Sequence, residues 1–261
     1  MNRTTVIGIP EREFAAVKAF FLRTTVPLIY ESGATAGIQG TGCLFETADS
    51  LYFVTAGHVL EDVDPSKLGI PLRQLNSEVF TLGRGLVGWS KNEEFDVGAY
   101  RIDDEQFEAK LRGGYMVLSA SNLGTPTKEG HFIVPGYPRA TVVRDNGTLK
   151  PKDITQIHTA IYDGEVVGSR TDRDLFLKLE RTAQGLWGHN VDVPDLRGIS
   201  GAPVWQLVSE RSEIWTPEAY LRLVGIQVAC DPRGEKYIRA LTWPVVQAAL
   251  GKLGSSSGGN P

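Results

Sequence analysis

The sequence predicts an all-β protein, and three observations lead to this prediction. Short apolar runs follow one another at short, regular spacing, with turn-forming residues between them. The 261 residues include 29 glycines and 14 prolines, which supply many turns and so favour short strands over long helices. Helical periodicity is confined to residues 11–23, 104–112 and 243–253. Regularly spaced strands separated by turns are typical of β-barrels or of a β-sandwich.

The first half of the chain is expected to hold a helix, five strands and a second, shorter helix. The residues that give Glu11–Arg23 an apolar helical face are Phe14, Val17, Phe20, Phe21 and Leu22. The expected strands are Val26–Tyr30, Ile38–Phe45, Leu51–Thr55, Glu78–Leu82 and Val97–Ile102. Asp103 or Asp104 is expected to cap a helix that runs to Arg112, since two glycines follow it.

The second half is expected to hold further strands and one closing helix. The Ser-, Gly-, Thr- and Pro-rich segment Leu118–Gly130 connects the halves. The strands are His131–Val134, Thr141–Arg144, Ile154–Tyr162, Leu175–Leu179, Pro203–Val208, Leu221–Cys230 and Tyr237–Leu241. The helix is Trp243–Leu253, and residues 254–261 are a flexible tail. The sequence therefore predicts a helical extension (1–25), two β units (26–120 and 121–253) and the tail.

Composition and charge exclude several classes of protein. Lys and Arg number 27 and Asp and Glu 31, a net charge of −4 without a basic block, so no nucleic-acid partner is expected. Apolar stretches such as Leu223–Cys230 are far shorter than the roughly 20 residues of a spanning helix, so no membrane partner is expected either. Met1–Pro10 lacks the apolar core of a secretory signal. With Cys43 and Cys230 as its two cysteines, expected to be free buried thiols, the chain is predicted to be cytoplasmic.

One glycine pattern and the scattered histidines are not assigned a chemical role. Residues Gly83–Gly88 fit G-x-G-x-x-G, but Trp89–Glu94 follow without an apolar helical face, so nucleotide binding is not expected. The surface or turns are the expected places of His131, His158 and His189. Because no His, Cys or Asp residues cluster, neither a metal site nor any cofactor is expected.

Three segments carry residues suited to nucleophilic catalysis. A strand runs into Thr55-Ala56-Gly57-His58-Val59, an acidic residue opens the strand in Phe95-Asp96-Val97, and a serine lies between glycines in Gly198-Ile199-Ser200-Gly201. A serine hydroxyl needs a base within hydrogen-bond reach, and the base needs an acceptor that fixes its tautomer. Flanking glycines let the backbone turn so that two amides face a developing oxyanion. Asp103 and Asp104 compete with Asp96 for the acceptor role.

The order of the three residues along the chain narrows the choice of fold. All four histidines precede Ser200, whereas an α/β-hydrolase has its histidine after the serine and a glycine where Ala202 stands. A subtilisin has its aspartate before the histidine, and the nearest candidate here, Asp49, lies in a different context. The order His58, Asp96, Ser200 is that of chymotrypsin. An esterase built on another fold is a weaker alternative, because it does not account for this order of the three residues along the chain.

These motifs resemble the trypsin-like (chymotrypsin-fold) serine peptidases of the prokaryotic, disulfide-free type. The resemblance covers roughly residues 26 to 253. Its motifs are Gly40–Phe45, Thr55–Val59, Gly198–Pro203, Val224–Val228 and the helix Trp243–Leu253. It implies two antiparallel six-stranded β-barrels, the first with His58 and Asp96 and the second with Ser200. Ile199 departs from the many secreted members that carry an aspartate there for activation by a newly cut N-terminus.

The resemblance also implies roles for individual residues in a serine endopeptidase acting on proteins or peptides. His58 would be general base and then acid, Asp96 would orient it, and Ser200 would attack. The amides of Gly198 and Ser200 would form the oxyanion hole. The alternative is a latent or inactive protease-like module that binds peptides by strand addition. The sequence does not identify a regulatory protein partner.

The same resemblance places the pocket for the residue before the scissile bond. Its walls would include Asp192, Pro194 and Asp195 on one side and Gln227, Val228 and Ala229 on the other. If Asp195 or Asp192 reached inward, the buried carboxylate would give a modest preference for Arg or Lys. If both are solvated loop charges, the pocket is small and mainly apolar.

Overall fold

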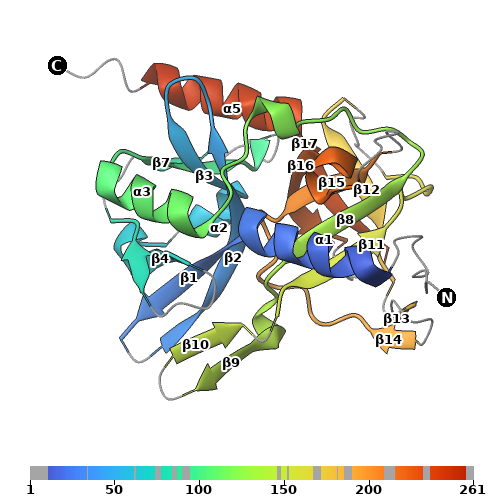
Figure 1. The fold of residues 1–261 in the computed structure, drawn as a ribbon, viewed down its shortest axis with the longest axis horizontal. Helices are drawn as coiled ribbons and strands as arrows, with labels where there is room; N and C mark the ends of the chain where they lie inside the picture. The colour runs from blue at the N-terminus through green and yellow to red at the C-terminus, as the bar shows by residue number, and fades with distance from the viewer. Residues whose placement is uncertain are drawn as a thin grey trace.

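The protein forms two antiparallel β-sheets with a helix near each end of the chain (Figure 1). The computed structural model describes residues 11–33, 35–61, 63–73, 78–83, 87–89, 95–145, 148–151, 153–166, 172–180, 182–184, 190–208, 215–231 and 236–256. The predicted all-β fold with two barrel-like sheets and two terminal helices is confirmed. His189 and most of the Gly83–Glu94 stretch lie outside the described residues.

The first sheet has the strand order β5-β4-β1-β2-β3-β7-β6. Its strands are β1 (Val26–Ser32), β2 (Thr35–Glu46), β3 (Leu51–Thr55), β4 (Leu68–Pro71), β5 (Val79–Thr81), β6 (Val87–Trp89) and β7 (Gly98–Ile102). The twelve-residue β2 pairs with β1 as far as Gly42 and with β3 from Cys43 onward. The predicted strand Leu51–Thr55 has the observed bounds, whereas β4 and β6 were not predicted because each has too few residues to show a period.

The second sheet has the order β11-β8-β15-β16-β17-β12. Its strands are β8 (His131–Gly136), β11 (Thr155–Thr159), β12 (Asp174–Lys178), β15 (Pro203–Leu207), β16 (Leu221–Cys230) and β17 (Tyr237–Thr242). Beyond β11 the chain meets β12, where Tyr162 N donates to Phe176 O at 2.9 Å and Lys178 N donates to Ala160 O at 2.9 Å. These hydrogen bonds join the two edge strands, so the second sheet closes into a barrel.

Two small ladders and several short helices lie outside the sheets. The ladders are β9 (Val142–Asp145) with β10 (Thr148–Pro151) and β13 (Thr182–Gln184) with β14 (Asn190–Asp192). The short helices are α2 (Gly57–Leu60), α4 (Pro217–Tyr220) and the 3-10 turns η1 (Pro65–Lys67), η3 (Ala120–Asn122) and η4 (Arg139–Thr141). Of these, α2 carries His58, so a single helical turn after β3 places the candidate base.

Helix α1 (Glu11–Thr24) packs against the second sheet, as Figure 1 shows in blue. Phe20 and Phe21 are buried, and their ring centroids lie 5.0 and 6.2 Å from the Trp205 ring of β15. Met116 N donates to Arg23 O at 2.8 Å, which ties the end of this helix to the segment entering the second half. The described part of the expected N-terminal extension therefore contributes Val17, Phe20 and Phe21 to the main hydrophobic core.

The other two long helices begin where predicted but extend past their predicted ends, the first of them through Gly113 and Gly114 instead of stopping at Arg112. Helix α3 (Glu105–Gly114) is capped by Asp104, whose Oδ1 accepts hydrogen bonds from Gln106 N and Phe107 N. Helix α5 (Trp243–Ser256) begins at Trp243 as predicted but continues to Ser256, three residues into the segment expected to be a flexible tail.

His131 and His158, expected at the surface or in turns, are partly exposed and lie in strands instead of turns. They are on the paired strands β8 and β11, and His131 Nε2 lies 3.0 Å from His158 Nδ1. Phe14 of α1 lies against His158, with 6.4 Å between ring centroids. Burial lowers the pKa of His158 to about 3, so this histidine is neutral.

No helix within the described ranges has both the length and the apolarity needed to cross a membrane.

Candidate active site

The first two residues of the predicted triad lie in direct contact. His58 N donates to Asp96 Oδ1 at 2.8 Å, and His58 Nδ1 lies 2.7 Å from Asp96 Oδ2. Since an ionised carboxylate only accepts hydrogen bonds, Nδ1 carries the ring proton of the neutral imidazole and Nε2 is left as the acceptor. A Cβ at Gly57 would lie 2.9 Å from Asp96 Oδ1, so a glycine there allows the close approach. This is the orientation a general base requires.

The two competing aspartates have other partners. Asp103 Oδ1 accepts a hydrogen bond from Arg101 Nε at 2.7 Å, and Asp104 caps α3. Both follow the last residue of β7, whereas Asp96 precedes the first residue of that strand, so they lie at opposite ends of it. Of the three aspartates considered from the sequence, Asp96 is the one beside His58.

The carboxylate of Asp96 sets the protonation behaviour of His58. Its hydrogen bond to the ring raises the pKa of His58 above the ordinary 6.5, and this outweighs the opposing effect of burial. The imidazolium that forms when a base accepts a proton is therefore stabilised at this site.

Ser200 lies in a tight turn that requires glycine at two positions. Gly198 has a φ of 102° and Gly201 a φ of 89°, in the region that disfavours residues with a Cβ. A Cβ at Gly201 would also lie 2.0 Å from Thr55 Oγ1 and 2.1 Å from Thr41 O. The turn therefore packs directly on the first sheet, and Thr41 N donates to Ser200 O at 2.8 Å across that contact.

The same turn leaves two amides available beside the serine hydroxyl. Thr41 Oγ1 donates to Gly198 O at 2.8 Å, which turns this carbonyl toward the first sheet. Within the described ranges, neither Gly198 N nor Ser200 N donates a hydrogen bond to another part of the chain. Two free amides in one turn are what an oxyanion hole requires. The side chain of Ile199 is buried in the core of the second barrel and anchors the turn without an ion pair.

Replacing Thr41 with valine is expected to reduce kcat more than it changes KM. The Thr41 hydroxyl is fully buried and bridges two groups, accepting from Tyr137 N at 3.2 Å and donating to Gly198 O. Without it the carbonyl is no longer held, and misplacement of the turn by about 1 Å costs roughly a hundred-fold in rate. Steady-state kinetics would measure this, with Thr41→Ser restoring kcat because it keeps the hydroxyl. A valine variant with parental kcat would contradict the positioning role.

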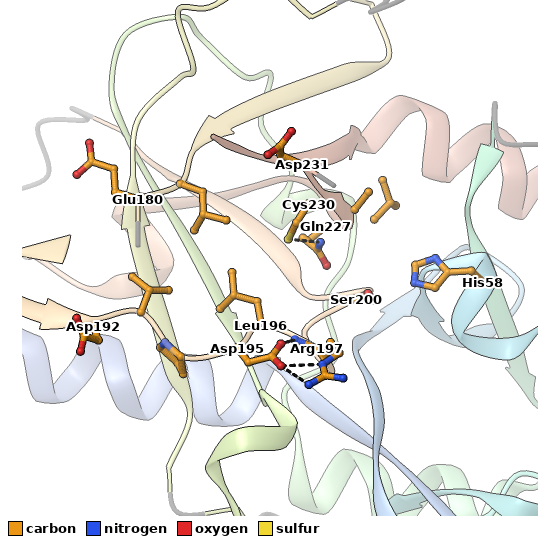
Figure 2. Close-up of a pocket in the computed structure, with 15 residues that line it drawn as sticks. His58, Glu180, Asp192, Asp195, Leu196, Arg197, Ser200, Gln227, Cys230 and Asp231 are labelled. Atoms are coloured by element: carbon orange, nitrogen blue, oxygen red, sulfur yellow. Dashed lines mark hydrogen bonds and ion pairs between the residues drawn. The ribbon is translucent and has the colours of Figure 1, made fainter. Parts of the chain in front are cut away.

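Ser200 and His58 line one pocket with a cavity volume of about 810 Å³ (Figure 2). The four residues predicted to bind substrate, Asp195, Gln227, Val228 and Ala229, all line it as well. Both residues are described, yet Ser200 Oγ and His58 form no hydrogen bond with each other here. Catalytic hydrogen bonds are often long in structures without substrate, so this geometry is compatible with either an active or a latent site.

The sequence left open whether the Asp195 carboxylate is buried in the pocket, and the structure shows that it is not. Its side chain is 47% exposed, and Oδ2 accepts a hydrogen bond from Arg197 Nε at 2.7 Å while Oδ1 accepts one from Arg197 N at 3.0 Å. These bonds lower the pKa of Asp195. Asp192 is exposed. The Arg197 guanidinium therefore neutralises the Asp195 carboxylate, one of the two that the sequence offered for recognition of a basic residue.

Several pocket residues were not predicted from the sequence. They are Leu179, Glu180, Val193, Leu196, Arg197, Cys230 and Asp231. Leu179 and Glu180 follow β12, which lies at the far edge of the barrel sheet from β11 in strand order. No motif marks these residues, because their place depends on the curvature of the barrel.

Both thiols are expected to stay reduced and to react slowly. Burial raises the pKa of Cys43 to about 12 and, with a smaller contribution from Asp231, that of Cys230 to about 11. Since the thiolate is the reactive form, iodoacetamide should label the native protein far more slowly than a free cysteine at about pH 7.5. Mass spectrometry of the unreduced, alkylated protein would test this. A cross-linked Cys43–Cys230 peptide would contradict the free state of the two thiols.

Comparison with known proteins finds likeness in structure but not in sequence. No protein-family model and no curated protein matches the chain. The thermostable serine protease AL20 from an extremophilic microorganism matches at a TM-score of 0.51 and 12% identity, over 87% of this chain and 95% of that one. The protease Anisep from Arthrobacter nicotinovorans matches at 0.50 and 12%, over 89% and 95%. The inactive form of Rv3671c from Mycobacterium tuberculosis matches at 0.51 and 14%, over 98% of each chain.

Identities this low bear on the fold alone. The structural neighbours include serine proteases, and the two antiparallel barrel-like sheets with the terminal helices match theirs. This chain therefore has the chymotrypsin-like fold.

Proposed function

We propose that this chain is a serine endopeptidase that hydrolyses peptide bonds of proteins or peptides through an acyl-enzyme. The observation that carries the proposal is the double contact of His58 with Asp96 in a pocket that also holds Ser200. The two free amides at Gly198 and Ser200 support it, since they supply the electrostatic stabilisation that acyl transfer needs.

The proposed reaction has two halves. In the first, Ser200 Oγ attacks the peptide carbonyl carbon and its proton passes to His58 Nε2, while the carbonyl oxygen becomes an oxyanion held by the two amides. The carbon–nitrogen bond then breaks, and His58 gives its proton to the leaving amine. In the second half, His58 takes a proton from water as the water oxygen attacks the ester carbonyl carbon. The bond between that carbon and Ser200 Oγ then breaks, Ser200 Oγ takes the proton back from His58, and the peptide leaves with a new carboxyl end.

The finer assignment is a trypsin-like enzyme of the disulfide-free, cytoplasmic type. It is supported by the order of the three residues, by the free state of Cys43 and Cys230, and by the buried Ile199. An apolar side chain at this position anchors the turn without a newly cut N-terminus. The enzyme is accordingly proposed to need no cleavage for its activation.

A fluorophosphonate probe tests the proposed function directly. Stoichiometric labelling of Ser200, located by mass spectrometry and absent in Ser200→Ala, is the expected result, because only an activated serine reacts quickly with such a probe. The same protein should cleave peptides from a mixed library.

A latent or inactive peptide-binding module is the second candidate. Ser200 Oγ and His58, both described, form no hydrogen bond with each other, which is the arrangement expected of a serine hydroxyl that is not activated. Peptide binding by calorimetry without labelling or cleavage would establish this candidate and exclude the enzyme.

A further inference from the structure

Gln227 lines the candidate active site and is bonded through its backbone to the turn that carries Ser200. It lies within β16, where Gln227 N donates to Ala202 O at 2.8 Å and Gly201 N donates to Gln227 O at 2.7 Å. These bonds join its backbone to the turn that carries Ser200. Its side chain lines the same pocket although the residue is only 1% exposed. The carboxamide is therefore held by a strand rather than by a loop.

The carboxamide oxygen of Gln227 has no hydrogen-bond partner among the described residues. Its nitrogen is directed at Cys230 Sγ, 3.8 Å away, whereas Oε1 is buried and unsatisfied. Figure 2 shows this oxygen pointing away from the Cys230 sulfur, toward the side of the pocket where Ser200 is drawn. Most buried polar atoms in proteins are satisfied. Of the unsatisfied buried side-chain atoms in the described chain, the Gln227 oxygen belongs to a residue that lines the pocket, so it is placed to accept from a donor that arrives with the substrate.

The charged groups around the pocket favour a cationic donor. Four carboxylates line it, those of Glu180, Asp192, Asp195 and Asp231. Among the lining residues that the structure describes, the one guanidinium is that of Arg197, and it is paired with Asp195. An anionic side chain entering this pocket would be repelled and a cationic one attracted.

The remaining walls of the pocket are apolar and suit a long aliphatic side chain that ends in a polar head. Leu179, Val193, Pro194 and Leu196 contribute apolar side chains to the pocket. Lysine and arginine bury their methylene groups along such surfaces while their charged heads keep polar partners. The pocket thus combines an apolar passage, a buried acceptor and an excess of negative charge.

We propose that Gln227 is a specificity-determining residue, whose Oε1 accepts a hydrogen bond from the cationic head of lysine or arginine on the amino side of the scissile bond. This inference rests on the proposed peptidase function and names its substrate class. It assigns to Gln227 the recognition that the sequence suggested for Asp195 or Asp192, because Asp195 is exposed and paired with Arg197.

The test compares matched fluorogenic peptides that differ only in the residue before the scissile bond. Lysine is set against norleucine, which keeps the chain and loses the head, and glutamate serves as the anionic case. The expected kcat/KM for lysine exceeds that for norleucine by roughly ten- to a hundred-fold, the size of a hydrogen bond to a charged group. Gln227→Leu should bring the ratio close to one, because leucine fills similar space without an acceptor.

Two further variants make the result decisive. Gln227→Glu should raise the ratio of kcat/KM for lysine to that for norleucine, since it adds a negative charge to the acceptor. This variant replaces Gln227→Leu as the test if the leucine variant does not fold. Asp195→Asn tests the competing assignment, and the proposal is overturned if this change, rather than Gln227→Leu, abolishes the ratio. A preference for glutamate, or a ratio that no Gln227 variant alters, would also overturn it.

Failure of this inference is distinguishable from failure of the proposed function. A protein whose Ser200 reacts with the fluorophosphonate and that cleaves after other residues keeps the peptidase function and loses only the role of Gln227. A protein that neither reacts nor cleaves loses both.

Discussion

Replacing Ser200 with alanine is expected to lower kcat for peptide hydrolysis about a million-fold, to the level left by binding and the oxyanion hole alone. The hydroxyl is the proposed nucleophile, and no other group in the turn can form the acyl-enzyme. Because Ser200 Oγ makes no hydrogen bond within the described chain, the free energy of unfolding should change by less than about 0.5 kcal/mol.

The companion change, His58→Ala, should cost nearly as much as the serine change. Losses within a triad are not additive, so the double variant should resemble either single one. Active-site titration with the fluorophosphonate and single-turnover kinetics would measure these losses, and urea unfolding would verify the fold. Near-parental turnover by Ser200→Ala would refute the proposed mechanism.

Replacing Asp96 with asparagine is expected to lower kcat about ten-thousand-fold and to move the acidic limb of the pH profile. The asparagine amide can donate to His58 Nδ1, whereas the carboxylate could only accept from it, so the other tautomer is favoured and Nε2 carries the proton. A base in that tautomer cannot accept the proton of Ser200. In the Ser-His-Asp triad of other proteases, this change costs about 10⁴ in kcat.

The direction of the pH shift follows from the pKa of His58. The hydrogen bond from His58 to Asp96 raises that pKa, so activity of the parental enzyme, which needs neutral His58, is lost as the pH falls through a value above 6.5. Without the carboxylate the pKa of His58 falls, and the limb of kcat/KM against pH moves to lower pH. Asp103→Asn is the matched control, since Asp103 pairs with Arg101 and should leave the profile unchanged. If the acidic limb of kcat/KM for Asp96→Asn stayed at the same pH as in the parental protein, the result would contradict the effect of Asp96 on the pKa of His58.

Strand and turn signals determined much of the fold from the sequence. Leu51–Thr55 and Leu221–Cys230 are long apolar runs with clear ends, and the observed strands have these bounds. The three-residue β6 and the four-residue β4 were not predicted, since such short segments show no period and are set by the strands they pair with. The closure of the second barrel through Tyr162 and Phe176 likewise depends on long-range pairing.

The candidate catalytic residues could be named from the sequence because local chemistry marks each of them. His58 and Ser200 lie in short motifs whose small residues the turns require, as the contacts of Gly57 and Gly201 explain. The choice of Asp96 over Asp103 and Asp104 became firm only where the folded chain brought one carboxylate to the imidazole. Residues 38 positions apart in sequence give no local sign of such a contact.

The sequence by itself determined the all-β class, the three motifs and their order, because periodicity and turn chemistry act over neighbouring residues. Only the tertiary structure decided the chemistry of the pocket. Asp195 resembles a specificity carboxylate in the sequence, but Arg197 neutralises it, while Gln227 resembles a buried strand residue and yet presents an open acceptor. Charge pairing and hydrogen-bond satisfaction depend on distances of a few ångströms between segments far apart in the chain, and folding alone sets those distances.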